Sequence, residues 1–268
     1  MIICYRRYLL IQGGKRLKRH LIIGGICLLL SACGSGGSSQ VTDPGAARNF
    51  NYNFDETSGA TAVNSNSPGH FDGVIYGAIR VPGKVGGALQ FGSSFGSRVE
   101  IPMQDPTSFN YLKIPFDNAI SIGAWIMLTS VPQSSIYHIV GNGYYGETSF
   151  RLQINSSGQI EFLLSDNITW HTIVTSNQAL TQDTWCYIVV TYDETTGRIY
   201  INGVEDSNFN ISFHLLTNYN TIYIGAIDND VNAQLPYQNQ FVGIIDELRI
   251  SKDLWTPQQI LEYYDSTK

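Results

Sequence analysis

Positive charge is scarce over most of this sequence, and its scarcity excludes several classes of partner. All 22 acidic residues lie beyond residue 32, whereas only 10 of the 16 Lys and Arg residues do. Residues 33–268 therefore carry a formal charge of 10 − 22 = −12. A surface of this sign repels nucleic acid and anionic membranes, and no basic patch in this part of the sequence offsets it. We expect no nucleic-acid partner.

A transmembrane-length apolar run is also lacking. The N-terminal apolar run, residues 21–30, has ten residues, half the roughly 20 that a helix needs to cross a bilayer. It has the length of a signal-peptide core, and it follows a basic stretch, residues 6–20, with no acidic residue. The last residue of the run and the three that follow it, Leu30-Ser31-Ala32-Cys33, resemble the lipobox of bacterial lipoproteins, whose cysteine is acylated and becomes the mature N-terminus. An uncleaved anchor helix, or an ordinary signal peptide with an incidental cysteine, is the alternative.

The lipobox resemblance implies three segments and a location. Residues 1–32 are then a signal peptide, and residues 33–47 are a lipidated Cys33 with a flexible Gly/Ser linker. Residues 48–268 remain for one large domain. Gly34, rather than Asp, follows the cysteine, and in bacteria with two membranes that favours sorting to the outer membrane. We expect a cell-envelope protein attached to the membrane through lipid.

Cysteine is too rare for a disulfide in the mature chain. Of the four cysteines, two lie in the signal peptide and Cys33 is the lipidation site, which leaves Cys186. An intramolecular disulfide is then excluded. Because Cys186 lies inside an apolar, strand-like run, we expect a buried structural thiol rather than a nucleophile.

Helical patterns are almost absent beyond the linker, and short strands dominate. Runs of apolar and β-branched residues are separated by Gly, Asn, Asp, Ser and Pro. Tight turns are predicted at residues 155–158, 193–197 and 202–203, and a single helix is predicted from Pro257 to Tyr264 with Thr256 as N-cap. The predicted strands are residues 52–54, 73–81, 88–91, 98–101, 119–128, 137–140, 150–154, 159–164, 170–175, 185–192, 198–201, 221–227 and 241–250.

This pattern predicts an all-β fold: a two-sheet antiparallel jelly-roll sandwich with one short C-terminal helix. Five segments in order, at residues 52–59, 86–91, 120–126, 185–203 and 243–250, resemble the motifs of laminin-G-like jelly-roll domains. These domains belong to the concanavalin A-like lectin/glucanase superfamily, and the resemblance spans residues 50–262. It implies two antiparallel sheets whose first and last strands are adjacent.

Catalytic patterns are missing. Glycan-cleaving members of this superfamily carry paired acids at alternate strand positions, because hydrolysis needs two carboxyl groups about 5 to 10 Å apart. No such run occurs, and Asp246 and Glu247 are neighbours that we expect to point to opposite faces of a strand. His138, His171 and His214 lack metal-ligand spacing. We therefore expect this protein not to be an enzyme. A glycan hydrolase is the least favoured alternative.

Calcium is the one cofactor that the resemblance suggests. A structural calcium in this superfamily often lies where the opening segment meets the closing strand, held by an aspartate and by backbone carbonyls. The resemblance places Asp246 as that ligand, with Asp55 near it. In the alternative interpretation, Asp246 caps a turn or pairs with Arg249, and Asp55 only begins a loop.

Aromatic residues in loops are the candidate ligand-binding groups, because their rings stack on sugars or anchor a protein partner. The candidates are Tyr144, Tyr145, Trp170, His171, Tyr219 and Tyr237. The leading hypothesis is a non-catalytic binding module for carbohydrate or an extracellular protein. A structural or adhesive envelope lipoprotein without a small ligand is the alternative.

Overall fold

The computed structural model describes residues 49–92, 94–102, 118–133, 135–142, 150–165, 169–214, 220–227 and 239–268. Five of the predicted functional residues lie outside this part: Cys33, Tyr144, Tyr145, Tyr219 and Tyr237. No helix in the described residues is long and apolar enough to cross a membrane.

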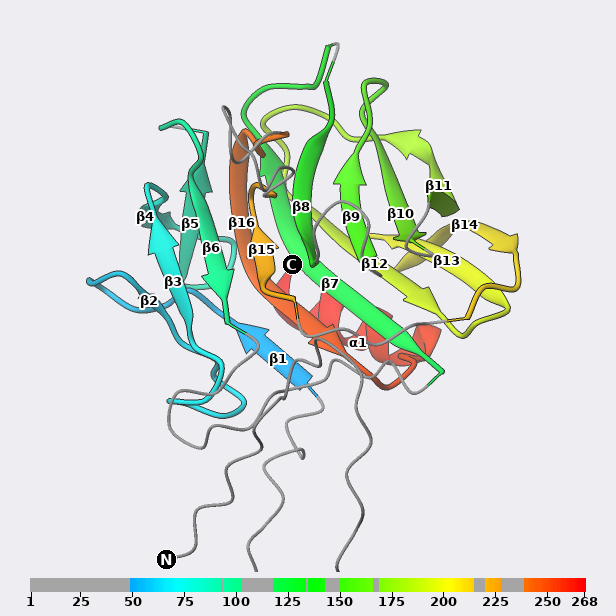
Figure 1. Cartoon of the computed structure of the whole chain (residues 1–268), viewed down its shortest axis with the longest axis horizontal. Coiled ribbons are helices and arrows are strands. Elements are labelled where there is room, and N and C mark those ends of the chain that lie inside the picture. Colours follow the sequence, from blue (N-terminus) through cyan, green and yellow to red (C-terminus); the bar gives the residue numbers. More distant parts are fainter. Residues whose placement is uncertain are drawn as a thin grey trace, which may run out of the picture. The chain divides into compact units, whose positions relative to one another are not determined.

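The described chain consists of short strands and one helix (Figure 1). The elements are β1 (Asn49–Tyr52), β2 (Thr61–Ala62), β3 (Gly73–Tyr76), β4 (Ile79–Pro82), β5 (Gly87–Phe91), β6 (Arg98–Ile101), β7 (Ile120–Leu128), β8 (Tyr137–Asn142), β9 (Phe150–Ile154), β10 (Gln159–Ser165), β11 (Trp170–Ala179), β12 (Cys186–Tyr192), β13 (Thr196–Ile201), β14 (Val204–Asn210), β15 (Ile222–Ile224), β16 (Gly243–Ser251) and α1 (Pro257–Thr267).

The strands form two antiparallel sheets. Sheet I has the order β14-β13-β12-β7-β16-β5-β4, with β1 also paired to β16. Sheet II has the order β11-β10-β9-β8-β15-β6-β3-β2. The predicted two-sheet antiparallel sandwich is confirmed, and so is the adjacency of its first and last strands.

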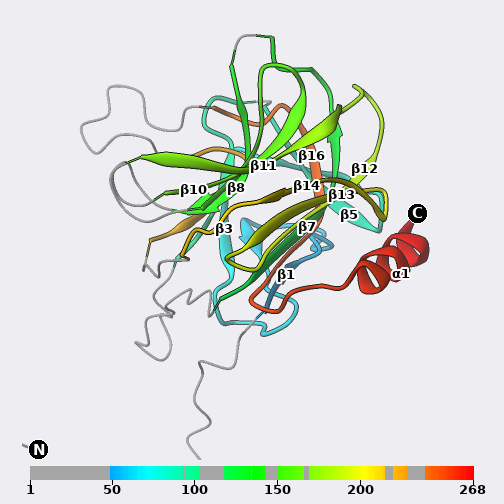
Figure 2. The ribbon, with the colours of Figure 1, turned by 90° about the vertical axis from the view of Figure 1, so that its right-hand side faces the viewer.

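Two apolar clusters stabilise this arrangement. The larger one lies between the sheets and takes inward-facing residues such as Ile122, Phe162 and Val190 from both of them. The smaller one lies on the outer face of sheet I, where Trp125 and Tyr187 pack under α1. Figure 2 shows α1 beside this sheet. Because both faces of sheet I are covered at this place, β12 is buried at every position.

The C-terminal helix begins as the sequence predicts. The Thr256 hydroxyl accepts a hydrogen bond from the Gln259 backbone N–H, and the Gln259 side chain accepts one from the Thr256 backbone N–H. This reciprocal capping satisfies two N–H groups that a helix start otherwise leaves unpaired. Ile260 is the residue of α1 that is buried against the sheet.

The strand prediction at residues 73–81 was wrong, and the strands β2 and β14 were not predicted. The predicted strand at residues 73–81 is two strands, because Gly77 adopts φ +64° and the chain passes from sheet II at β3 to sheet I at β4. β14 was not predicted at all, because its polar sequence is mostly exposed along the edge of sheet I.

Candidate functional site

A break in sheet I brings acidic side chains together. On one side, β16 pairs with β5 through Gly243–Ile245 and then with β1 through Leu248–Ser251. Asp246 and Glu247 lie at the change of partner, where the register with β7 also shifts. Glu247 adopts φ +51°, which marks a bulge in the strand.

The bulge corrects one expectation from strand alternation. Asp246 is the cross-strand partner of Trp125, whose ring packs under α1. Glu247 accepts a hydrogen bond from the hydroxyl of Tyr263 in α1 at 2.5 Å. Both acids therefore lie on the outer side of sheet I, because the extra residue of a bulge interrupts the alternation of side chains.

We call the group formed by Asp55, Asp246 and the glycine-rich turn at residues 83–87 the acid cradle. One carboxylate oxygen of Asp246 (Oδ2) accepts a hydrogen bond from the Val85 N–H at 2.9 Å. Asp55 Oδ1 accepts one from the Gly87 N–H at 2.7 Å. The turn between β4 and β5 thus contacts both the segment after β1 and the bulge of β16.

The cradle requires glycine. A Cβ atom at Gly83 would stand 2.5 Å both from Asp246 Oδ2 and from the carbonyl oxygen of Gly87. At Gly86, which adopts φ +62°, a Cβ atom would collide with Asp55 Oδ1. Carboxylate and carbonyl oxygen atoms therefore occupy the places that larger side chains would need.

Asp246 is electrostatically unusual. The residue is fully buried, and burial raises the pKa of its carboxyl group to about 7, with a further increase from the charge of Glu247. Its second oxygen, Oδ1, is buried without a hydrogen-bond partner. A buried carboxylate oxygen without a donor is costly unless a proton or a cation neutralises it.

The cradle fits a hard cation with oxygen ligands, but side chains alone do not complete the set. Among the described residues, no three His, Cys, Asp or Glu side chains gather in a way that would hold a metal ion. Backbone carbonyls, such as that of Gly87, would have to supply the remaining ligands, as they do in many calcium sites. Of the two alternatives for Asp246, turn capping occurs, because Asp246 accepts the Val85 N–H of the turn between β4 and β5. The Arg249 guanidinium lies instead over the ring of Tyr263 at 4.5 Å.

Trp170 and His171 do not share a surface. Trp170 faces outward from sheet II, where the guanidinium of Arg151 lies 4.0 Å from the ring centroid. His171 pairs across the strands with the buried Leu164, and its ring lies 4.9 Å from that of Phe213. Of these two candidates, Trp170 has the outward position that a ligand contact needs.

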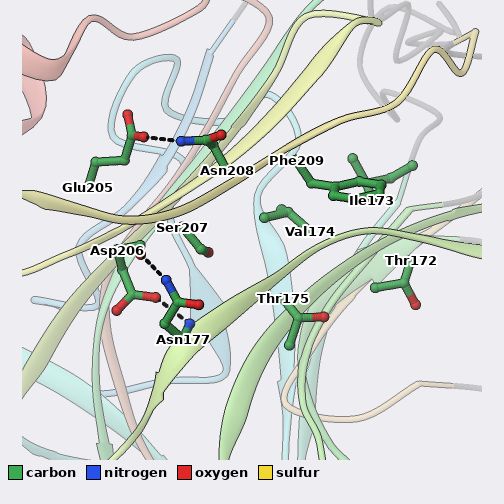
Figure 3. A pocket seen from close by; sticks show the side chains of 10 residues that line it. All are labelled: Thr172, Ile173, Val174, Thr175, Asn177, Glu205, Asp206, Ser207, Asn208 and Phe209. Atoms are coloured by element: carbon green, nitrogen blue, oxygen red, sulfur yellow. Dashed lines mark hydrogen bonds between the residues drawn. The ribbon is translucent and has the colours of Figure 1, made fainter.

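Thr172, two residues after Trp170 in β11, lines a groove that the sequence analysis did not predict (Figure 3). The groove has a volume of about 500 Å³ and runs between β11 and β14, the edge strands of the two sheets. Its lining residues are Thr172, Ile173, Val174, Thr175, Asn177, Glu205, Asp206, Ser207, Asn208 and Phe209.

Irregularities in both edge strands shape the groove. In β14, Asp206 is the extra residue between the pairs Ile199–Ser207 and Tyr200–Glu205. In β11, the register with β10 also shifts before Ala179. The Asp206 carboxylate accepts hydrogen bonds from the Asn177 N–H and from the Gln178 side chain, so these irregular positions join the edges of the two sheets.

The lining of the groove is amphipathic. Figure 3 shows Ile173, Val174 and Phe209 toward one end and the Asp206–Asn177 pair toward the other. The Phe209 ring is 55% exposed, and the hydroxyl oxygen of Ser207 is buried without a hydrogen-bond partner. Apolar surface beside a few convergent polar groups is the usual composition of a small-molecule site.

One sequence signal could have found this groove. Asn202 and Gly203 both adopt positive φ, +52° and +83°, as a two-residue hairpin turn requires. This turn predicts a strand on each side, and the strand after it is β14. The polar composition of β14 concealed that strand.

The two antiparallel sheets, with their first and last strands paired, define a lectin-like jelly-roll sandwich. A laminin G family model, described as the concanavalin A-like lectin/glucanases superfamily, matches residues 99–261. The chain belongs to this family. A comparison with curated proteins finds none that matches.

Solved structures share the fold at low sequence identity. Domain 4 of an extracellular arabinanase from Geobacillus stearothermophilus, solved with arabinotriose, has a TM-score of 0.58 at 19% identity, covering 80% of this chain and 96% of that one. A botulinum neurotoxin type C structure, described as depending on two ganglioside molecules for cell entry, has a TM-score of 0.60 at 15% identity, covering 82% and 51%. A Trypanosoma rangeli sialidase has a TM-score of 0.59 at 15% identity, covering 83% and 33%.

Proposed function

We propose that this protein is a non-catalytic carbohydrate-binding module of the cell envelope, and that the groove between β11 and β14 binds the sugar. The observation that carries the proposal is the amphipathic lining of the groove. The exposed Phe209 ring offers an apolar face on which a sugar ring can stack. The exposed side chains of Thr172 and Asn208 offer hydrogen bonds to sugar hydroxyls.

The charge of the lining favours a neutral sugar. No Lys or Arg lines the groove, whereas Glu205 and Asp206 do. Carboxylates accept hydrogen bonds from sugar hydroxyls but repel acidic sugars. The arabinotriose complex of the arabinanase domain, which is similar over nearly its whole length, supports this ligand class.

A non-catalytic role is supported by the way the two acids are used. Hydrolysis needs two carboxyl groups that both face the substrate. Both oxygens of Asp206 accept hydrogen bonds from Asn177 and Gln178, so this carboxylate joins the two strands. Glu205 alone cannot supply the acid and the nucleophile.

Titration calorimetry with arabinotriose and with a panel of neutral oligosaccharides tests the proposed groove. We expect Phe209→Ala to weaken binding at least tenfold, about 1.4 kcal/mol, because it removes the stacking surface. Thr172→Ala should weaken binding severalfold with little loss of stability, because Thr172 is exposed and lines the groove. Val204→Ala is the matched control, since Val204 is 66% exposed on the same strand but does not line the groove.

Each other outcome points to a different function. If Phe209→Ala binds as tightly as the wild type, the sugar site lies elsewhere, and Trp170 is the next residue to substitute. Turnover of any oligosaccharide would contradict the non-catalytic role. Capture of a neighbouring envelope protein without sugar binding would favour an extracellular protein partner or a structural lipoprotein.

We also propose that the acid cradle binds calcium. Asp246 Oδ1, which has no hydrogen-bond partner, and the carboxylate of Asp55 would be its side-chain ligands. The cation would neutralise the buried charge and would hold the end of β1, the turn at residues 83–87 and the bulge of β16 together. Asp55 is exposed, so its carboxylate is the ligand that solvent reaches.

The proposed membrane attachment depends on Cys33. We expect the wild-type protein to fractionate with membranes and to need detergent for release. Cys33→Ala removes the acylation site, so the variant should appear in the soluble fraction. Cys186→Ala is the control, because that thiol is buried in the folded domain and should not affect fractionation. Membrane retention of Cys33→Ala would contradict the lipid anchor.

A further inference from the structure

A second pocket lies on the outer face of sheet I, beneath α1. Its volume is about 370 Å³. Arg249 of β16 and Tyr187 of β12 form its floor, and Trp255, Gln259 and Tyr263 are among the residues around it. None of these residues lines the groove between β11 and β14.

Arg249 is chemically distinctive in this pocket. Its guanidinium lies 4.5 Å from the ring centroid of Tyr263 and 5.4 Å from that of Trp255. Three other arginines of the described chain, Arg80, Arg98 and Arg198, each pair with a carboxylate. The guanidinium of Arg249 makes no ion pair with any described residue.

The nearby acids do not satisfy this guanidinium. Burial raises the pKa of Glu247 and the nearby charge of Arg249 only opposes that rise, while Glu247 Oε2 accepts a hydrogen bond from the hydroxyl of Tyr263. Glu262 stands at the rim and accepts a hydrogen bond from Gln258 at 2.7 Å. The half-buried guanidinium of Arg249 thus packs against two aromatic rings, and its N–H donors line a cavity.

We propose that this pocket binds the carboxylate of an acidic monosaccharide. A planar guanidinium matches a carboxylate through two parallel hydrogen bonds, a geometry that an ammonium group cannot reproduce. The half-buried ring of Trp255 provides apolar surface for the sugar, and Gln259 and Ser266 provide polar groups for its hydroxyls. The cavity is near the lower end of the range for ligand pockets, about 300 to 1,000 Å³, which suits one sugar residue.

The rim selects for a single negative charge. The carboxylate of Glu262 repels anions, and it repels a doubly charged phosphate more strongly than a singly charged sugar acid. The proposal does not depend on the proposed function of the groove, because the two cavities differ in place and in charge.

The test measures binding of D-glucuronic acid and of N-acetylneuraminic acid to the purified full-length protein by calorimetry. Glucose and inorganic phosphate are the comparison probes. We expect at least one of the two acids to bind and both comparison probes to bind at least tenfold more weakly. Arg249→Lys keeps the positive charge but removes the planar guanidinium that can donate two parallel hydrogen bonds. It should weaken acid binding at least tenfold.

If Arg249→Lys fails to fold, two further variants still test the proposed pocket. Glu262→Gln changes an exposed side chain and should tighten acid binding severalfold, because it removes repulsion at the rim. Phe209→Ala should leave acid binding unchanged, because that residue belongs to the groove. Failure of both acids to bind, phosphate binding as tightly as the acids, or Glu262→Gln without effect would each overturn the proposal.

Discussion

Calcium should raise the melting temperature of this protein, and Asp246→Asn should abolish that response. A ligand that binds only the folded state stabilises it by about 2.7 kcal/mol at a hundredfold excess over its dissociation constant. For a domain of this size, that corresponds to an increase of about 5 to 10 °C. Thermal unfolding in calcium and in chelator measures the difference.

The measurement in chelator tests whether the uncompensated charge of Asp246 destabilises the calcium-free protein. Without a cation, the wild type keeps a buried carboxylate whose Oδ1 has no donor, and burial raises the pKa of this group to about 7. Asn at position 246 removes the charge and keeps the shape. In chelator, at a pH above 7, Asp246→Asn should therefore be at least as stable as the wild type, although most substitutions at buried positions destabilise.

The matched control is an exposed acid. Asp265 lies on α1 and pairs with Lys268 at 2.7 Å, so Asp265→Asn removes the same charge away from the cradle. Its calcium response should equal that of the wild type. A wild type with the same melting temperature in calcium and in chelator would rule out the calcium site.

Local sequence signals predicted most of the fold, because its strands are short and its turns have clear chemistry. The turns at residues 155–158 and 193–197 and the N-cap at Thr256 formed as predicted. The failures came where tertiary context decides. Gly77 sends two adjoining strands into different sheets, and β14 is a strand because β13 pairs with it and not because its own residues favour one.

The candidate sites were less accessible to sequence reasoning. Asp55 and Asp246 were found through the family resemblance, but the glycine turn that completes the cradle depends on backbone geometry. The alternation rule failed at Glu247 because a bulge cannot be read from residue types. The groove was missed because it needs two edge strands that are distant in the sequence, and the role of Arg249 depends on rings that α1 brings to it.

Gly225→Ala should be among the most destabilising substitutions in the described chain. Gly225 adopts φ +83°, and an added Cβ atom would collide with the ring of the buried Phe91. The backbone cannot easily shift, because the Gly225 N–H donates to the Ile139 carbonyl at 2.9 Å and the Phe241 N–H donates to the Gly225 carbonyl at 2.7 Å. Left-handed strain of about 1 to 2 kcal/mol and overpacking of about 1 to 3 kcal/mol predict a loss of about 2 to 5 kcal/mol.

Gly158→Ala separates these two contributions. Gly158 adopts nearly the same φ, +80°, but the nearest atom to an added Cβ is 3.5 Å away. This variant should lose only the strain, about 1 to 2 kcal/mol, when unfolding is measured in urea. Equal losses in the two variants would mean that the Phe91 ring moves aside, and the packing around Gly225, where the segment before β16 meets β8, would then be looser than the fold indicates.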